Sequence, residues 1–192
     1  MRDSKSIEQI HRKGVDIPLS LLNLDQTVRE LMIKEIEADI SAGRLYVSRR
    51  LSPSGVKDYP ALLKEAVQSY DDFWLTSQLA APGRLNATET RNTKRGAITA
   101  KLPYNAPEML AEGEFNRFYL RALCLLAMQS NVSNLIVYRA KEVINPRPES
   151  QSMIGKSIDP EKLLADLRAN PGVDTALGLP AGPNSGLSAK LP

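Results

Sequence analysis

Apolar residues recur with a helical period in four segments of this chain, and this pattern predicts four helices. The predicted helices span residues 23–42, 59–79, 107–130 and 160–169. Asn23 is a suitable N-cap for the first helix and Gly43 a suitable C-terminal stop, while Asp159 and Pro160 have the same starting role for the last. The third helix contains the most concentrated apolar run of the chain, EFNRFYLRALCLLAM. We therefore expect this third helix to be the main core element.

Alternation of apolar and polar residues predicts three short strands. They span residues 44–51, 97–102 and 135–143, and the last, LIVYRAKEV, has the strongest strand signal. Residues 84–95 are polar and basic without an apolar period, so a loop is expected there. Because helices separate the strands, the pattern favours an α+β fold in which helices cover a small sheet of two or three strands.

The two ends of the chain differ from the middle in composition. Residues 1–22 show no sustained period, and residues 171–192 are rich in glycine and proline. We expect a single α+β domain at residues 23–170, with an N-terminal arm before it and a C-terminal arm after it. Four leucines could hold the second arm against the domain or a neighbouring subunit: Leu177, Leu179, Leu187 and Leu191.

The net charge of the chain is only +3, but the charges are segregated. The basic residues of the segment 84–101 are Arg84, Arg91, Lys94, Arg95 and Lys101, against the single acid Glu89. Residues 44–57 contain Arg44, Arg49, Arg50 and Lys57 and no acid, whereas acids outnumber bases in the predicted helix 23–42. Such patches favour docking onto a surface of opposite charge.

Residues with catalytic or metal-binding chemistry are scarce. His11 is the only histidine and Cys124 the only cysteine, so a Cys/His zinc site is excluded and a catalytic triad would depend on the N-terminal arm. The stretch SQSMIGKS, residues 150–157, resembles a phosphate-binding loop but has Ser150 where the first glycine is needed. Asp71 and Asp72 are adjacent and would diverge on a helix. We expect no enzymatic activity, no catalytic residue, no cofactor and no metal; an enzyme of an unfamiliar kind is the third alternative.

Targeting signals are not evident in the sequence. No apolar stretch approaches the roughly 18 residues of a membrane span, and the first residues are too polar for a signal peptide. We therefore expect no membrane partner and a cytoplasmic location, or a place within an assembly built in the cytoplasm.

Two functions remain as hypotheses. The first is a non-enzymatic structural or assembly subunit of a homo- or hetero-oligomer, such as a virion or mobile-element component, which uses its arms and charged patches for protein–protein contacts. The alternative is a nucleic-acid-associated accessory protein that contacts phosphates through the basic loop 84–101 and the strand 44–51. The candidate interface or phosphate contacts are Arg49, Arg50, Arg91, Lys94, Arg95, Arg117 and Arg121.

Arg117 and Arg121 lie one helical turn apart on the third predicted helix. Their spacing places them outside its aromatic face, and Glu114 precedes Arg117 by three residues. We expect both arginines at the rim of the buried face, in surface ion pairs. An interface or anion contact is the alternative, and guanidiniums pointing into a cavity would favour an enzyme.

Overall fold

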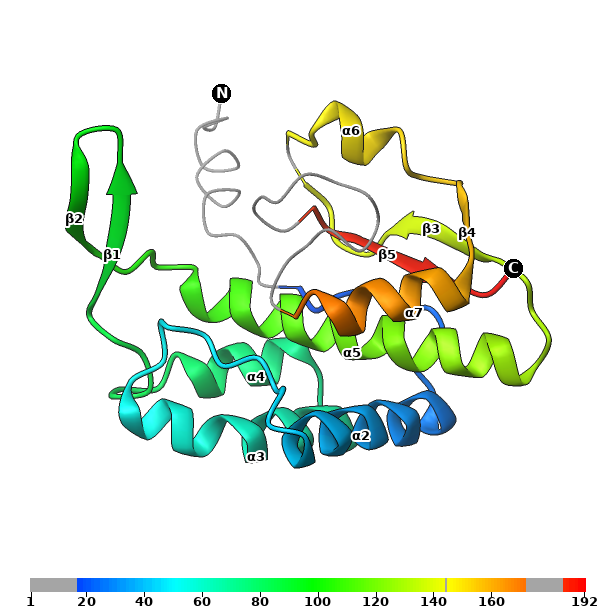
Figure 1. The fold of residues 1–192 in the computed structure, drawn as a ribbon, viewed down its shortest axis with the longest axis horizontal. Helices are drawn as coiled ribbons and strands as arrows, with labels where there is room; N and C mark the ends of the chain where they lie inside the picture. The colour runs from blue at the N-terminus through cyan, green and yellow to red at the C-terminus, as the bar shows by residue number, and fades with distance from the viewer. Residues whose placement is uncertain (1–16, 144, 172–184) are drawn as a thin grey trace, which may run out of the picture.

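The computed structural model describes residues 17–143, 145–171 and 185–192, and Figure 1 shows their arrangement. The helices are α2 (Gln26–Ser41), α3 (Pro53–Ser69), α4 (Asp72–Leu79), α5 (Ala106–Gln129), α6 (Pro148–Gln151) and α7 (Pro160–Ala169). The strands are β1 (Thr88–Thr93), β2 (Gly96–Lys101), β3 (Leu135–Arg139), β4 (Ser157–Ile158) and β5 (Leu187–Lys190). Helices thus combine with small antiparallel sheets, and the predicted α+β class is confirmed.

Helix α5 is the central element, because α2, α4, α7 and β5 all pack against it (Figure 1). Phe115, Phe118, Tyr119 and Leu123 of this helix are completely buried. A helix that is apolar on most of its circumference is stable when neighbours cover it on most sides. The predicted helix at residues 107–130 is confirmed, with each end displaced by one residue.

The predicted helix at residues 23–42 is confirmed as α2, but Asp25 rather than Asn23 caps it. The Asp25 carboxylate accepts a hydrogen bond from the Val28 N–H at 2.9 Å. The Asn23 side chain instead accepts from the N–H of Leu191 at 3.0 Å. Asn23 therefore joins the start of α2 to the end of the chain.

The predicted helix at residues 59–79 is two helices, α3 and α4. Helix α3 begins six residues earlier than expected, because the Ser52 side chain caps it and Pro53 occupies its first position. The helix ends at Ser69 with Tyr70 as its C-cap, and the side chain of Asp71 caps a new helix directly afterwards. Residues 53–55 are thus in the first turn of α3. The apolar period continues across the break between α3 and α4, which only the Asp71 cap marks.

The predicted strand at residues 44–51 is wrong. Within it only Leu51 pairs, in an isolated antiparallel bridge with Leu85, and Arg49 and Arg50 form a turn. The apolar alternation is interrupted at Arg49, and no strand of the described residues lies beside the segment. Without a neighbouring strand to pair with, a segment of strand-like composition is an extended loop.

The loop expected at residues 84–95 is also partly wrong, because residues 88–93 form β1. This strand pairs with β2 in a two-stranded antiparallel hairpin, so the strand predicted at 97–102 is confirmed but belongs to a sheet separate from β3. Neither face of the hairpin is buried against the helices. The apolar alternation that marks a half-buried strand is therefore missing from the sequence of β1.

The second sheet has the strand order β4-β3-β5 and is antiparallel throughout. Strand β3 ends at Arg139, four residues before the predicted end. Strand β5 comes from the segment assigned to the C-terminal arm, and its residues Leu187 and Ala189 are buried against the core. Just before β5, Gly186 has φ +68°, and a Cβ there would lie 2.6 Å from the Lys141 carbonyl oxygen. Residues 187–190 are thus part of the folded body.

Residues 17–22 of the N-terminal arm also contact the body. The Leu19 N–H donates to the carboxylate of Asp72 at 3.1 Å, and the Ser20 N–H donates to the Ala140 carbonyl at 2.9 Å. Residues 1–16, which include His11, lie outside the described residues, as do Leu177 and Leu179. The predicted helix at 160–169 is confirmed as α7, with Asp159 as its cap.

Candidate functional site

The β1–β2 hairpin, residues 88–101, is an exposed ribbon at one end of the described fold. It projects from the layer of helices, and α5 begins just after it (Figure 1). Nearly all of its residues are exposed, and Lys94 and Arg95 form the turn at its tip. Gly96, with φ +117°, follows this turn in a conformation that favours glycine. A two-stranded hairpin alone in water is at best marginally stable, so we expect the contacts at its base to stabilise it.

The base of the hairpin is fastened to the loop between α2 and α3. The Ser52 N–H donates to the Arg84 carbonyl at 3.0 Å, and the Asn86 N–H donates to the Arg50 carbonyl at 2.9 Å. The Asn86 side chain donates to the Leu51 carbonyl at 3.0 Å. These contacts bring together the two basic segments that the sequence analysis singled out.

The charges of the hairpin are mostly uncompensated. Glu89 accepts hydrogen bonds from the Nε atoms of Arg91 and Arg50, each at 2.7 Å, and these bonds lower the pKa of Glu89. Lys94 and Arg95 at the tip form no ion pair with another described residue. The same holds for Lys101, so the hairpin presents three free positive charges.

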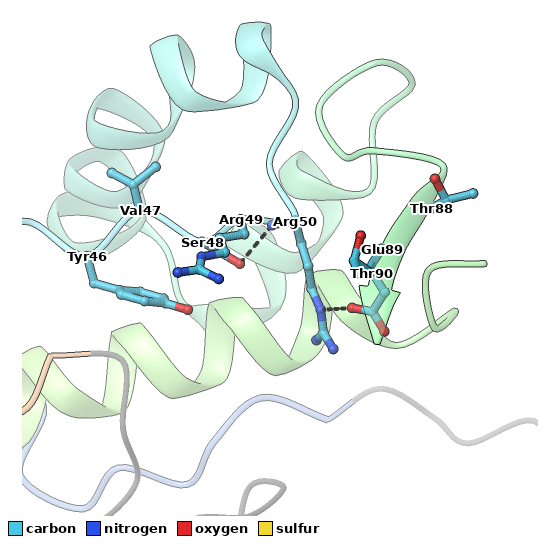
Figure 2. Close-up of a pocket in the computed structure, with 8 residues that line it drawn as sticks. All are labelled: Tyr46, Val47, Ser48, Arg49, Arg50, Thr88, Glu89 and Thr90. Carbon is cyan, nitrogen blue, oxygen red and sulfur yellow. Dashed lines mark hydrogen bonds and ion pairs between the residues drawn. The ribbon is translucent and has the colours of Figure 1, made fainter. Parts of the chain in front are cut away.

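A groove lies between the α2–α3 loop and the first residues of β1, and we call it the hairpin-base groove (Figure 2). Its volume is about 670 Å³. The residues that line it are Tyr46, Val47, Ser48, Arg49, Arg50, Thr88, Glu89 and Thr90. Tyr46 also packs against the core, whereas Arg49 is exposed and has no ion-pair partner among the described residues. The groove thus combines an aromatic ring, a free guanidinium and several hydroxyl groups.

Sequence reasoning missed Tyr46 and the threonines of this groove. Tyr46 lies about forty residues from Thr88 and Thr90 in the chain, and no local pattern connects them. The prediction did include Arg49, Arg50 and the basic hairpin residues, because segregation of charge is visible without knowing the fold.

Arg121 is not at the rim of α5 as predicted; it is 1% exposed and is bound inside the protein. Its Nη1 lies 2.5 Å from an Asp39 carboxylate oxygen, and its Nε lies 2.7 Å from the Glu35 carboxylate. Arg168 of α7 also donates to Glu35, at 2.5 Å. Burial opposes ionisation of Glu35, but the hydrogen bonds from the two arginines outweigh it and lower its pKa. We call these four residues the α2–α5–α7 charge network.

Arg117 is also buried, at 5% exposure, so its prediction as a rim residue is wrong as well. Its expected ion pair with Glu114 is present but lies in the interior, and the Arg117 guanidinium stacks over the Phe118 ring at 4.8 Å. Its Nε and Nη1 have no hydrogen-bond partner among the described residues, and neither has the buried hydroxyl of Tyr59. Burial raises the pKa of Glu114 more than Arg117 lowers it. In the chain as described, neither Arg117 nor Arg121 is accessible to an external phosphate.

Helix α2 presents fewer free acids than its sequence suggests. Glu35 and Asp39 are buried in the charge network, and Glu37 pairs with Lys64 at 2.7 Å. Glu35 and Asp39 lie four residues apart within the buried stripe of α2. An exposed acidic patch that could pair with the basic hairpin of another copy is therefore much reduced.

Groups with other chemistry do not form a second site. Burial raises the pKa of Cys124 to about 12, so its reactive thiolate is disfavoured. Among the described residues no group of three or more His, Cys, Asp or Glu side chains is placed to hold a metal ion. Residues 150–157 run from α6 through a turn at Gly155 to β4, which is not the strand–loop–helix order of a phosphate-binding loop. No helix in the described part of the chain has the length and apolar character needed to cross a membrane.

Comparison of the chain with protein families, with curated proteins and with solved structures gives no significant match. The site must therefore be interpreted from its own geometry.

Proposed function

We propose that this chain is a non-enzymatic, nucleic-acid-associated accessory protein that contacts phosphates through the β1–β2 hairpin and the α2–α3 loop at its base. The observation that supports this most directly is the projecting hairpin with free charges at Lys94, Arg95 and Lys101. Exposed lysines and arginines bind the phosphate backbone by displacing its condensed counterions, without requiring a particular base sequence.

The dimensions of the hairpin suit this function. Each of its strands has six residues, which span roughly 20 Å at about 3.3 Å per residue. A two-stranded ribbon of this kind fits the major groove of a duplex, about 12 Å wide, and can also follow a single strand. The hairpin can therefore bring its charged tip to phosphates that the helical body does not reach.

The composition of the hairpin favours a polyanion over an acidic protein surface. Its residues include only one large apolar side chain, Ile98, which is 50% exposed. The centres of protein interfaces are typically enriched in aromatic residues and depleted in lysine. A Thr-rich ribbon with lysine and arginine at its tip resembles such a centre poorly.

The test is binding of a generic labelled oligonucleotide, single-stranded or duplex, measured by fluorescence anisotropy across a series of salt concentrations. Replacing both tip residues, Lys94→Ala with Arg95→Ala, removes about two phosphate contacts. It should reduce the slope of log K against log salt by about 1 to 2. The matched control is Lys34→Ala with Lys162→Ala, which removes the same charge from exposed helical positions and should leave the slope nearly unchanged.

Two results would contradict the proposal. One is the absence of binding by the wild-type protein at low salt. The other is an equal loss of affinity in the tip variant and the helical control, because that would show an effect of net charge rather than of the hairpin.

A second candidate function, a structural or assembly subunit, has one observation in its favour. The strands β1 and β2 pair only with each other among the described residues, so each presents an unpaired outer edge. A strand from another copy or another subunit could add to such an edge. Mass photometry decides this point: a monomer at every concentration, alone and with the oligonucleotide, would contradict homo-oligomer assembly, whereas oligomers that disappear on shortening the hairpin would support it.

A further inference from the structure

We infer that the hairpin-base groove binds an unpaired base of a single-stranded nucleic acid, with Tyr46 as the stacking surface and Arg49 as the adjacent phosphate contact. This inference rests on the proposed function and specifies its ligand: a single strand in preference to a duplex. The hairpin alone gives no such preference, because its charges can contact the phosphates of either form.

Tyr46 is placed as a stacking surface requires. The Tyr46 side chain is partly buried: it packs against the hydrophobic core and also lines the groove, among the residues drawn in Figure 2. Aromatic rings of this kind bind bases of any sequence, because every base has a flat π face. The basic segment 84–101 contains no aromatic residue, and the fold supplies the ring from the α2–α3 loop.

The charges around the groove are arranged for an extended strand. Arg49 is exposed at the groove and has no described ion-pair partner. Lys101, another free charge, lies opposite the groove residue Thr88 in the hairpin register. Lys94 and Arg95 are the free charges at the hairpin tip. Lys94 follows Glu89 in the groove by five positions, a distance of roughly 17 Å along the strand. A single strand that leaves the groove along β1 would therefore meet positive charge at both ends of its path.

The size and polarity of the groove suit one nucleotide. Its volume of about 670 Å³ lies within the range of roughly 300–1,000 Å³ typical of small-molecule sites. Ser48, Thr88 and Thr90 line it and supply hydroxyl groups that can donate to or accept from the edge of any base. A paired base can enter only after it is unstacked and unpaired from its duplex, which costs free energy that a single strand does not lose. We therefore expect the groove to select the single strand.

The experiment uses the full chain and a short oligonucleotide with one 2-aminopurine, offered both single-stranded and in a duplex. Stacking on a tyrosine changes 2-aminopurine fluorescence, and anisotropy of an end label gives the affinity. Tyr46→Leu keeps an apolar side chain on the core but removes the ring; it should weaken single-strand binding roughly 5- to 100-fold and abolish the fluorescence change. Duplex affinity should change less than twofold. Tyr46→Phe keeps the ring and should behave as the wild type.

Two further variants separate this inference from a general loss of folding or charge. Tyr104→Leu is the matched control, because Tyr104 lies three positions after the hairpin, is 97% exposed and lies outside the groove; it should leave binding unchanged. Arg49→Ala changes an exposed side chain, so it should fold normally and weaken single-strand binding more than duplex binding.

The outcomes distinguish the inference from the function on which it rests. If the tip variant of Lys94 and Arg95 weakens binding while Tyr46→Leu and Arg49→Ala do not, the groove is not a base site, although the proposed function stands. The absence of a 2-aminopurine signal with the bound wild-type protein also overturns the inference. If polyglutamate of equal charge competes as well as the oligonucleotide, the ligand is an acidic chain and both proposals fail. Failure of the wild type to bind either nucleic acid overturns both as well.

Discussion

The α2–α5–α7 charge network should contribute strongly to the stability of the fold, and Arg121→Met tests this most directly. Methionine retains an unbranched apolar side chain in the same space but removes the guanidinium. After the substitution Asp39 would have lost its described cationic partner, while Glu35 would retain Arg168. Both carboxylates are nearly inaccessible to water, at 4% and 5% exposure. The substitution therefore leaves an uncompensated negative charge in the interior.

The magnitude follows from the cost of an unpaired buried charge. Removal of one partner from a buried ion pair typically lowers the free energy of unfolding by about 3 to 5 kcal/mol. Arg121 also contacts the Phe118 ring, with its guanidinium carbon 4.9 Å from the ring centroid, and this contact would be lost too. For a chain of 192 residues whose whole stability is of the order of 10 kcal/mol, such a loss is a large fraction. We expect a destabilisation of about 3 to 5 kcal/mol.

The assay is equilibrium unfolding in urea at pH 7, monitored by the fluorescence of Trp74. Urea is uncharged, so unlike guanidinium it does not screen the charges under test. The matched control is Arg44→Met, because Arg44 is exposed and its replacement should change stability by less than about 0.5 kcal/mol. Adding Asp39→Asn to Arg121→Met removes the unpaired charge and should restore at least about 1 kcal/mol. A loss below about 1 kcal/mol in Arg121→Met, or no recovery in the double variant, would refute the reasoning.

Three further predictions concern other parts of the fold. Burial, opposed by the hydrogen bond from Leu19, raises the pKa of Asp72 from its ordinary 3.8 to about 6. Between pH 3.8 and about 6, the folded state therefore keeps a proton on Asp72 that the unfolded state has released. The free energy of unfolding falls as the pH rises through this range. In urea, the free energy of unfolding of Asp72→Asn should exceed that of the wild type by about 1 to 3 kcal/mol at pH 7.5 and nearly equal it at pH 4.5. A difference that does not change with pH would contradict the raised pKa of Asp72. A Cβ at Gly55 would lie 2.0 Å from the Arg84 carbonyl oxygen. Gly55→Ala should therefore lower the free energy of unfolding by about 1 to 3 kcal/mol and increase hydrogen exchange at the hairpin base. Unchanged exchange would contradict the anchoring of the hairpin base at this position. Deletion of residues 187–192 removes β5 and should lower the free energy of unfolding by at least about 3 kcal/mol, and a wild-type melting curve would show that this strand is dispensable.

Helices α2, α5 and α7 could be predicted from the sequence to within three residues at each end, because each buries apolar residues. Burial imposes a period of 3.6 residues on the apolar positions, and caps such as Asp159 are read locally. The break between α3 and α4 was missed because the apolar period continues across Tyr70 and Asp71. Strand β1 was missed because neither of its faces is buried, so its sequence lacks the alternation on which strand prediction depends.

The charge network could have been suspected from the sequence, although it was not predicted. Glu35 and Asp39 lie four residues apart within the apolar stripe of α2, which also contains Met32 and Ile36. Acids in a buried stripe require a cationic partner. The partner's identity does not follow from any local pattern, because Arg121 lies more than eighty residues away in the chain.

Three properties of this protein follow from local sequence: the α+β class, the positions of the main helices and the segregation of positive charge into residues 44–57 and 84–101. These properties are local, since they depend on side-chain period, capping and composition. Which of the positive charges are free depends on the tertiary packing. It buried Arg117 and Arg121 among acids and left Lys94 and Arg95 exposed, because accessibility depends on which distant segments pack over a side chain. The same packing brought the α2–α3 loop, which carries Tyr46, to the base of the hairpin and thereby formed the groove.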